Sequence, residues 1–149
     1  MSRILFVDDD RFFGAPYVTA LREHFAERII IDVCTRIDDA VHYCHAQDKL
    51  TAIILDVMMP PPQIDDGNIG FLAEEGFATG IWFLRSLKSQ LIERQIRVFV
   101  LTNRNFDEVR TLVAGLNFPQ GLIECERKIA VSAAQLPNRV AGLLGRVVR

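Results

Sequence analysis

The stretch AIILDVMMP at residues 52–60 decides the fold class of this chain. Its first four residues are apolar without interruption, which is typical of a strand buried on both faces of a parallel sheet. Asp56 follows directly, and Pro60 marks the start of a loop. A carboxylate at the end of such a strand lies at the carboxyl edge of an α/β sheet, where these folds bind ligands. Asp56 is therefore the first candidate functional residue.

A second apolar strand, RILFV at residues 3–7, also runs into acidic residues, namely Asp8, Asp9 and Asp10. If the two strands are neighbours, three or four carboxylates converge at one edge of the sheet. Their mutual repulsion is costly unless a divalent cation lies between them. Asp10 is better explained as the residue that starts the following helix.

Strand and helix patterns alternate along the whole chain and predict one domain, residues 1–149. We expect strands at about 3–8, 29–34, 51–56, 97–102 and 121–125, and helices at about 13–27, 37–48, 80–93, 105–116 and 132–147. Helix caps are expected at Asp38 or Asp39, at Thr79 and at Asn105. Five βα repeats predict a doubly wound α/β fold, with a parallel sheet and helices on both faces.

Residues 61–79 interrupt this rhythm with a long, acidic, Gly/Pro-rich segment that follows the candidate edge. Long loops in compact domains are often lids or binding loops. A tolerated surface insertion is equally consistent, because the entropy of loop closure grows slowly with length. Both interpretations stay open, and a short helix at 69–75 is expected within the segment.

Composition excludes several classes of protein. The net charge of −2 gives no electrostatic basis for direct binding to nucleic acid. No apolar run reaches the roughly 18 residues of a membrane span. Three cysteines at unrelated spacings argue against a disulfide framework and fit a reducing compartment. We expect a cytoplasmic protein.

The last two expected strands also lead to polar side chains, Thr102 and Lys128. A carboxylate can attack phosphorus as a nucleophile. Mg²⁺ prefers oxygen ligands, and a hydroxyl and an ammonium group can hold phosphoryl oxygens. Together these groups suit phosphoryl transfer.

With these residues assembled, the whole chain resembles the stand-alone (CheY-like) receiver domain of two-component response regulators. The resemblance is carried by VDDD at 7–10, LDVMMP at 55–60, LT at 101–102 and Lys128, in the order of that family. It implies a flavodoxin-like five-stranded sheet of strand order 2-1-3-4-5, with an insertion after strand 3.

The resemblance also implies a role for each site residue. Asp56 is the expected phosphoacceptor. The expected magnesium ligands are Asp8, Asp9, Asp56 and the backbone carbonyl of Met58. Thr102 is the expected switch hydroxyl and Lys128 the expected phosphate-binding lysine.

The same resemblance implies partners. The phosphoryl group would come from a sensor histidine kinase or a histidine phosphotransfer protein, and the output would pass to a downstream protein. A homodimer through residues 105–116, 121–125 and 132–147 is a further expectation. The chain would catalyse only its own phosphorylation and dephosphorylation and would not be a turnover enzyme.

Three residues depart from the family pattern: Ile129 stands where proline is usual, Cys125 where an aromatic switch residue is common, and Asn103 where a small residue is typical. The bond before Ile129 is expected to be trans. Asn103 borders access to the phosphoacceptor. These departures support an alternative, a pseudo-receiver that acts as a phosphorylation-independent interaction module. A phosphatase or dehalogenase with an aspartate nucleophile is disfavoured, because Met58 stands where such enzymes place a second acid.

Overall fold

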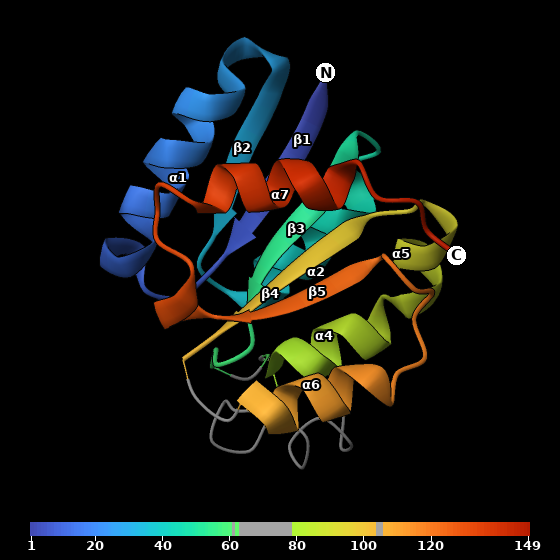
Figure 1. Cartoon of the computed structure of the whole chain (residues 1–149). Coiled ribbons are helices and arrows are strands. Elements are labelled where there is room, and N and C mark those ends of the chain that lie inside the picture. Colours follow the sequence, from blue (N-terminus) through green and yellow to red (C-terminus); the bar gives the residue numbers. More distant parts are fainter. Residues whose placement is uncertain (61, 63–78, 104–105) are drawn as a thin grey trace.

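The computed structural model describes residues 1–60, 62, 79–103 and 106–149. Its centre is a parallel five-stranded sheet of order β2-β1-β3-β4-β5 (Figure 1). The strands are β1 (Ser2–Val7), β2 (Ile29–Cys34), β3 (Leu50–Asp56), β4 (Arg97–Thr102) and β5 (Ile123–Arg127). The predicted fold class and strand order are confirmed.

Helices cover both faces of the sheet. On one face lie α1 (Arg11–Phe25) and α7 (Leu136–Leu144). The other face is covered by α2 (Ile37–Ala46), α4 (Thr79–Ser86), α5 (Lys88–Glu93) and α6 (Phe106–Ala114). Two short 3₁₀ helices complete the described elements, η1 (Ala26–Arg28) and η3 (Lys128–Ala130).

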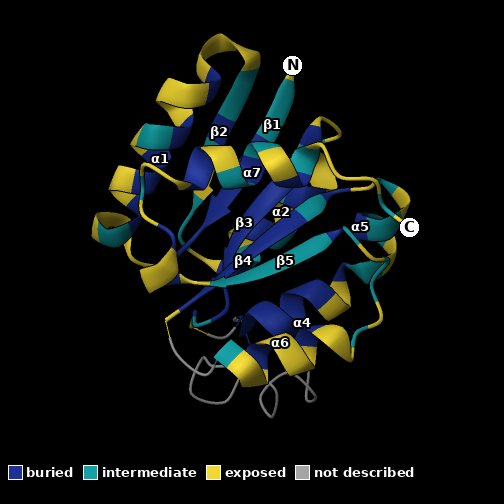
Figure 2. Ribbon diagram, viewed as in Figure 1, coloured by how far each residue is buried: buried dark blue, intermediate teal, exposed yellow. Residues whose placement is uncertain are grey.

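The two faces form two separate cores because successive strand residues point to opposite sides. Along β3, Ala52 and Ile54 belong to the core under α1 and α7. Ile53 and Leu55 belong to the core under the other helices. Figure 2 shows β3 and β4 buried at the centre, with the edge strand β5 only half-buried. The unbroken apolar run in the sequence therefore reflects burial on both faces.

Several predicted boundaries are wrong in detail. The helix predicted at 80–93 is two helices separated by Leu87, whose φ and ψ of −104° and 10° leave the helical region. The last strand begins at Ile123 and extends to Arg127, so Lys128 follows it directly. The helix predicted at 132–147 is shorter, and reciprocal hydrogen bonds between Ser132 and Gln135 precede it in the manner of a capping box.

The predicted caps have mixed outcomes. Asp38 and Asp39 do not cap α2: its N-cap is Arg36, and both acids lie in the first turn, where they favour the helix dipole. Thr79 is already a residue of α4, and its buried hydroxyl has no hydrogen-bond partner in the described part of the chain. Asn105 lies outside the described residues.

The predicted insertion at 61–79 and its short helix at 69–75 also lie outside the described residues, apart from Pro62 and Thr79. The chain returns to the sheet at Gly80, whose N–H donates to the Val57 carbonyl at 3.1 Å. A Cβ at Gly80 would lie 2.7 Å from the Val57 Cα, so this close approach requires glycine. Gly80, at the start of α4, is thus anchored against the end of the strand that carries Asp56. Among the described helices, none has the length and apolar character needed to span a membrane.

Candidate functional site

Strand register brings the two acidic segments together. Val7 pairs with Leu55 in the β1–β3 ladder, so the next residues, Asp8 and Asp56, emerge side by side at the carboxyl edge. Each of Asp8, Asp9 and Asp56 places a carboxylate oxygen within 4.8 Å of the other two. The predicted convergence of these three acids is confirmed, and oxygen ligands at this spacing suit a hard divalent cation.

The ammonium group of Lys128 contacts both buried acids, Asp8 and Asp56. Its Nζ lies 3.2 Å from Asp8 Oδ2 and 3.2 Å from Asp56 Oδ2. All three residues are less than 10% exposed. The described residues contain no cis peptide bond, so the expected trans bond before Ile129 is confirmed. Lys128 reaches the acids without a following proline.

Backbone N–H groups orient both carboxylates. The Met58 N–H donates to Asp56 Oδ1 at 3.0 Å, and the Asp10 N–H donates to Asp8 Oδ1 at 2.9 Å. Asp10 itself caps α1 by accepting from the Phe13 N–H, which confirms its predicted role as a helix start. The Met58 carbonyl as a metal ligand stays a prediction.

The electrostatics of the site show more negative charge than one lysine neutralises. Burial raises the pKa of Asp56 from 3.8 to about 6, and the Asp8 charge adds to the rise, although Lys128 and the Met58 N–H oppose it. The pKa of Asp9 is also raised, first by burial and then by the Asp8 charge. Burial acts to lower the pKa of Lys128, but the charges of Asp56 and Asp8 outweigh it and the pKa is raised. The site therefore combines one charged lysine with more carboxylate groups than that lysine can neutralise.

Thr102 ends β4 and is fully buried at the same edge of the sheet. It pairs in register with Arg127, the residue before Lys128. Asn103 follows as an exposed residue. The structure thus places Thr102 and Lys128 on neighbouring strand ends, as predicted, and the role of Asn103 in access stays open.

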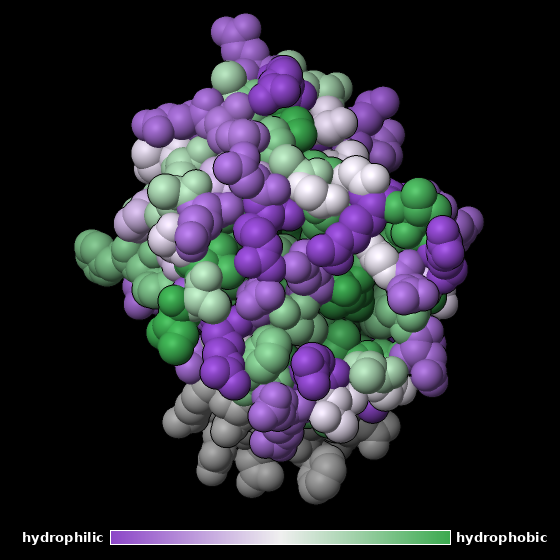
Figure 3. Space-filling view, viewed as in Figure 1, coloured by the Kyte–Doolittle hydropathy of each residue, from purple (hydrophilic) through white to green (hydrophobic). Residues whose placement is uncertain are grey.

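Cys125 takes the place of the expected aromatic residue and lines a hollow of about 320 Å³ between α6 and β5. Phe118, Ile123 and Val113 form apolar parts of its wall. Figure 3 shows apolar surface gathered along β5 above α6. Burial raises the pKa of the Cys125 thiol to about 11, so the thiol is neutral at pH 7. A neutral, half-buried thiol is a weak nucleophile.

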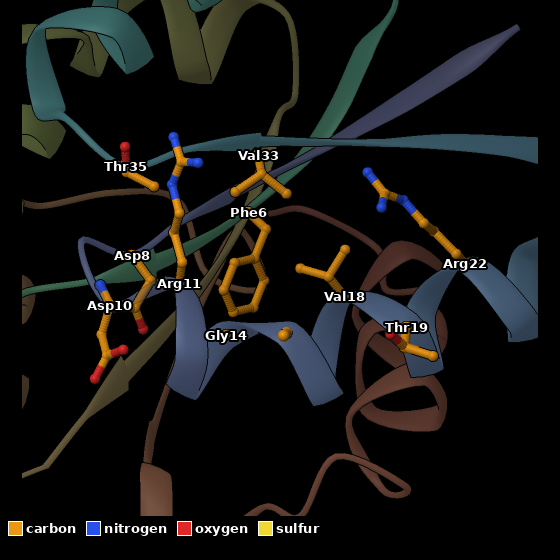
Figure 4. Close-up of a pocket in the computed structure, with 11 residues that line it drawn as sticks. Phe6, Asp8, Asp10, Arg11, Gly14, Val18, Thr19, Arg22, Val33 and Thr35 are labelled. Atoms are coloured by element: carbon orange, nitrogen blue, oxygen red, sulfur yellow. The ribbon is translucent and has the colours of Figure 1, made fainter.

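A second hollow, of about 410 Å³, adjoins the acidic edge between α1 and β2. Asp8 and Asp10 lie at one end and Arg22 at the other, with Phe6 and Val18 between them (Figure 4). The carboxylate cluster is therefore bordered by open space on the α1 side.

Two functional neighbours were not predicted from the sequence. The Lys128 Nζ lies 4.4 Å from the centre of the Phe13 ring, and the Tyr17 hydroxyl donates to the Val131 carbonyl at 2.8 Å. The only signal in the sequence is that Phe13 and Tyr17 stand four residues apart on one helix and so share a face. Their partners lie more than 110 residues away along the chain.

Comparisons with known proteins show which fold carries this site. No family model and no curated protein sequence matches the chain. Solved receiver domains match over nearly its whole length. The signal receiver domain of a DNA-binding response regulator (merR) from Colwellia psychrerythraea 34H is 20% identical, with a TM-score of 0.68, and 98% of this chain and 100% of that chain are covered.

Two further structures give the same result. The chemotaxis protein CheY4 of Vibrio cholerae is 16% identical with a TM-score of 0.69, covering 96% of this chain and 98% of that chain. A response regulator receiver protein from Pseudomonas putida is 18% identical with a TM-score of 0.67, covering 95% of this chain and 96% of that chain. The chain has the fold of response regulator receiver domains.

Proposed function

We propose that this protein is a phosphoacceptor of two-component signalling that takes a phosphoryl group on Asp56. One observation carries the proposal: Asp56 is buried at the carboxyl edge with two further carboxylates within 4.8 Å and a buried lysine at 3.2 Å. A purely structural ion pair would need one acid for one lysine. Three converging acids create a site for a cation and for a phosphoryl group.

In the proposed reaction an Asp56 carboxylate oxygen attacks the phosphorus of a phosphohistidine. The new O–P bond forms as the P–N bond breaks, and the bond electrons leave with the imidazole, which takes up a proton from solvent. Lys128 balances charge on the transferred group from its position on Asp56. Thr102 supplies a buried hydroxyl at the adjacent strand end for a phosphoryl oxygen.

Asp8, Asp9 and Asp56 fit Mg²⁺, because their oxygens converge and their combined charge exceeds that of Lys128. When bound, Mg²⁺ would neutralise charge on the phosphoryl oxygens. The Met58 carbonyl is proposed as a further ligand. The protein's own part is to hold these oxygens in place through the N–H groups of Met58 and Asp10.

A histidine kinase or histidine phosphotransfer protein is the proposed donor. Two apolar side chains beside the site favour protein docking: Phe12 at the start of α1 is 95% exposed, and Ile129 beside Lys128 is 86% exposed. Downstream contact with another protein, a dimer through α6, β5 and α7, and self-catalysis without turnover are parts of the same proposal. Three free cysteines support a reducing, cytoplasmic location.

Intact mass spectrometry after incubation with acetyl phosphate and Mg²⁺ tests the proposal. We expect one added phosphoryl group in the wild-type protein and none in Asp56→Asn or in EDTA. Asp48→Asn is the matched control, because Asp48 is exposed and precedes the opposite end of the same strand. The control should be labelled like the wild type.

The alternative, a pseudo-receiver, predicts a different outcome. It gives no adduct with acetyl phosphate and none with a phosphorylated histidine phosphotransfer protein. That pair of results would contradict the proposed function.

A further inference from the structure

Lys128 needs to be held in place by something other than its own neighbours in the chain. It opens the short helix η3, and the next side chain, Ile129, points into solvent with 86% exposure. A lysine stem has four rotatable carbons and loses much conformational entropy when it is fixed. Its ammonium is nevertheless held within 3.2 Å of two carboxylates. Charge attraction alone does not fix the backbone from which the side chain starts.

The backbone next to Lys128 is fixed by a residue from near the N-terminus. The hydroxyl of Tyr17, on α1, donates to the carbonyl of Val131, and this hydrogen bond is buried. The Val131 N–H in turn donates to the Lys128 carbonyl at 3.3 Å. Tyr17 is 7% exposed and Val131 is 1% exposed, so water does not compete for this bond. One hydrogen bond thereby ties η3 to α1.

The ammonium is covered by a second residue of the same helix. The Phe13 ring centre lies 4.4 Å from the Lys128 Nζ, within the range of a cation–π interaction. The rings of Phe13 and Tyr17 are 5.3 Å apart, so each supports the orientation of the other. Asp10 caps this helix by accepting from the Phe13 N–H, which sets the start of α1 next to the acids.

We propose that Phe13 and Tyr17 are positioning residues that hold Lys128 on the Asp8–Asp56 pair. Tyr17 fixes the backbone of η3, and the Phe13 ring covers the ammonium. The contacts of Phe13 and Tyr17 are present in the structure. Their consequence for phosphoryl transfer rests on the proposed function.

The three lysines of the chain, Lys49, Lys88 and Lys128, make a direct test possible. Protein labelled with ¹³C-lysine gives three sets of ε-methylene NMR signals, and the set lost in Lys128→Arg assigns Lys128. We expect the Lys128 signal to be shifted upfield by the Phe13 ring, relative to the exposed Lys49. The measurement uses no phosphodonor, so it is independent of the proposed function.

Variants distinguish the effect of the Phe13 ring on the Lys128 signal from the effect of a general change in the fold. Phe13→Leu should move the Lys128 signal to the position of Lys49, and Phe13→Tyr should restore the upfield shift. Tyr17→Phe keeps the ring but removes the hydroxyl, and it should reduce the splitting between the two ε protons of Lys128. Phe12→Leu is the matched control, because Phe12 is adjacent in sequence but 95% exposed, and it should leave the Lys128 signal unchanged.

An unchanged Lys88 signal shows that each variant is folded, because the Lys88 Nζ lies 6.0 Å from the centre of the Phe118 ring. A Lys128 signal that coincides with that of Lys49 in the wild type, or that ignores Phe13→Leu, overturns the proposal.

Phosphorylation by acetyl phosphate supplies the second readout. Loss of one buried hydrogen bond in Tyr17→Phe should slow labelling of Asp56 about fivefold. Loss of the cation–π contact in Phe13→Leu should slow it about three- to tenfold. Phe13→Tyr should recover the rate. Equal rates in all variants, in a wild type that is labelled, overturn the positioning role.

Discussion

Two clusters in this molecule place a pair of carboxylates on one cation, and they differ in burial and in charge balance. At the carboxyl edge, Lys128 contacts Asp8 and Asp56, and all three side chains are 6% exposed or less. On β5, Arg139 contacts Glu124 and Glu126 at 2.7 Å each, and its side chain is 37% exposed. Arg146 also contacts Glu124 at 3.1 Å, so two arginines face two glutamates there.

The difference distinguishes a cluster of balanced charge from one with an excess of negative charge. The Arg139 cluster is partly buried, is neutral as a group, and ties α7 to β5. The buried cluster, with Asp9 beside it, has three acids for one lysine, and burial raises the pKa of Asp56 to about 6. A fold does not need such an imbalance for stability, because buried charges without full compensation are costly. The proposed Mg²⁺ would supply the missing positive charge.

Removing the lysine should have the largest effect on stability. Lys128→Met leaves Asp8 and Asp56 facing each other without a buried cation, and should lower the free energy of unfolding at pH 7 by about 3 kcal/mol. Urea denaturation measures this. Lys49→Met, the same change at an exposed lysine, should have little effect. Similar stabilities for the two variants would mean that Lys128 does not compensate the acids.

Removing the charge of Asp56 should instead raise the free energy of unfolding. The folded pKa of Asp56 is raised above its ordinary value, so its contribution to stability is full below pH 4 and is lost as the pH rises through about 6. Asp56→Asn, which cannot ionise, should therefore be more stable than the wild type at pH 7 by about 3 kcal/mol, measured in EDTA.

The pH dependence of the stability difference gives a further test of that prediction. The stability difference between Asp56→Asn and the wild type should grow between pH 4 and pH 6 and then level off. A difference that is constant over this interval would show that burial of the Asp56 charge is not the cause.

Mg²⁺ should stabilise the buried cluster and leave the Arg139 cluster unaffected. At ten times its dissociation constant, the ion should raise the free energy of unfolding by about 1.4 kcal/mol. Asp9→Asn should reduce this gain, whereas Glu124→Gln should retain it because Glu124 lies in the balanced cluster. Thermal melts with and without Mg²⁺ measure the gain. An equal loss in both variants would point to a non-specific ion effect.

The smallest effect is expected at the Arg139 cluster. Arg139→Met should lower the free energy of unfolding by less than about 1 kcal/mol, because its partners are partly solvated. Salt at about 1 M should remove most of that loss, since exposed charges are screened. A loss that persists in high salt would mean that packing of the Arg139 stem, not its charge, stabilises α7.

The sheet and its acidic edge could be predicted because their signals are local. The apolar run before Asp56 and the acids after β1 each lie within a few residues, and parallel strands bring their carboxyl ends to one edge. Lys128 could be predicted from its place after the last strand, even though that strand begins two residues later than expected.

Other features depend on contacts that no local pattern reveals. The Tyr17–Val131 hydrogen bond joins residues 114 positions apart. The break at Leu87 occurs without glycine or proline, and Arg36 precedes α2 where a capping side chain was expected at Asp38 or Asp39. Leu87 is buried in the core beneath α4 and α5, so at that break packing prevails over local propensity.

The most direct test of the central claim is to locate the phosphoryl group. The protein is incubated with acetyl phosphate and Mg²⁺ and then reduced with borohydride, which converts an aspartyl phosphate to homoserine, and its peptides are mapped by mass spectrometry. The account predicts homoserine at position 56, with Asp8, Asp9 and Asp10 unmodified. Modification at one of those three acids with Asp56 intact would contradict it.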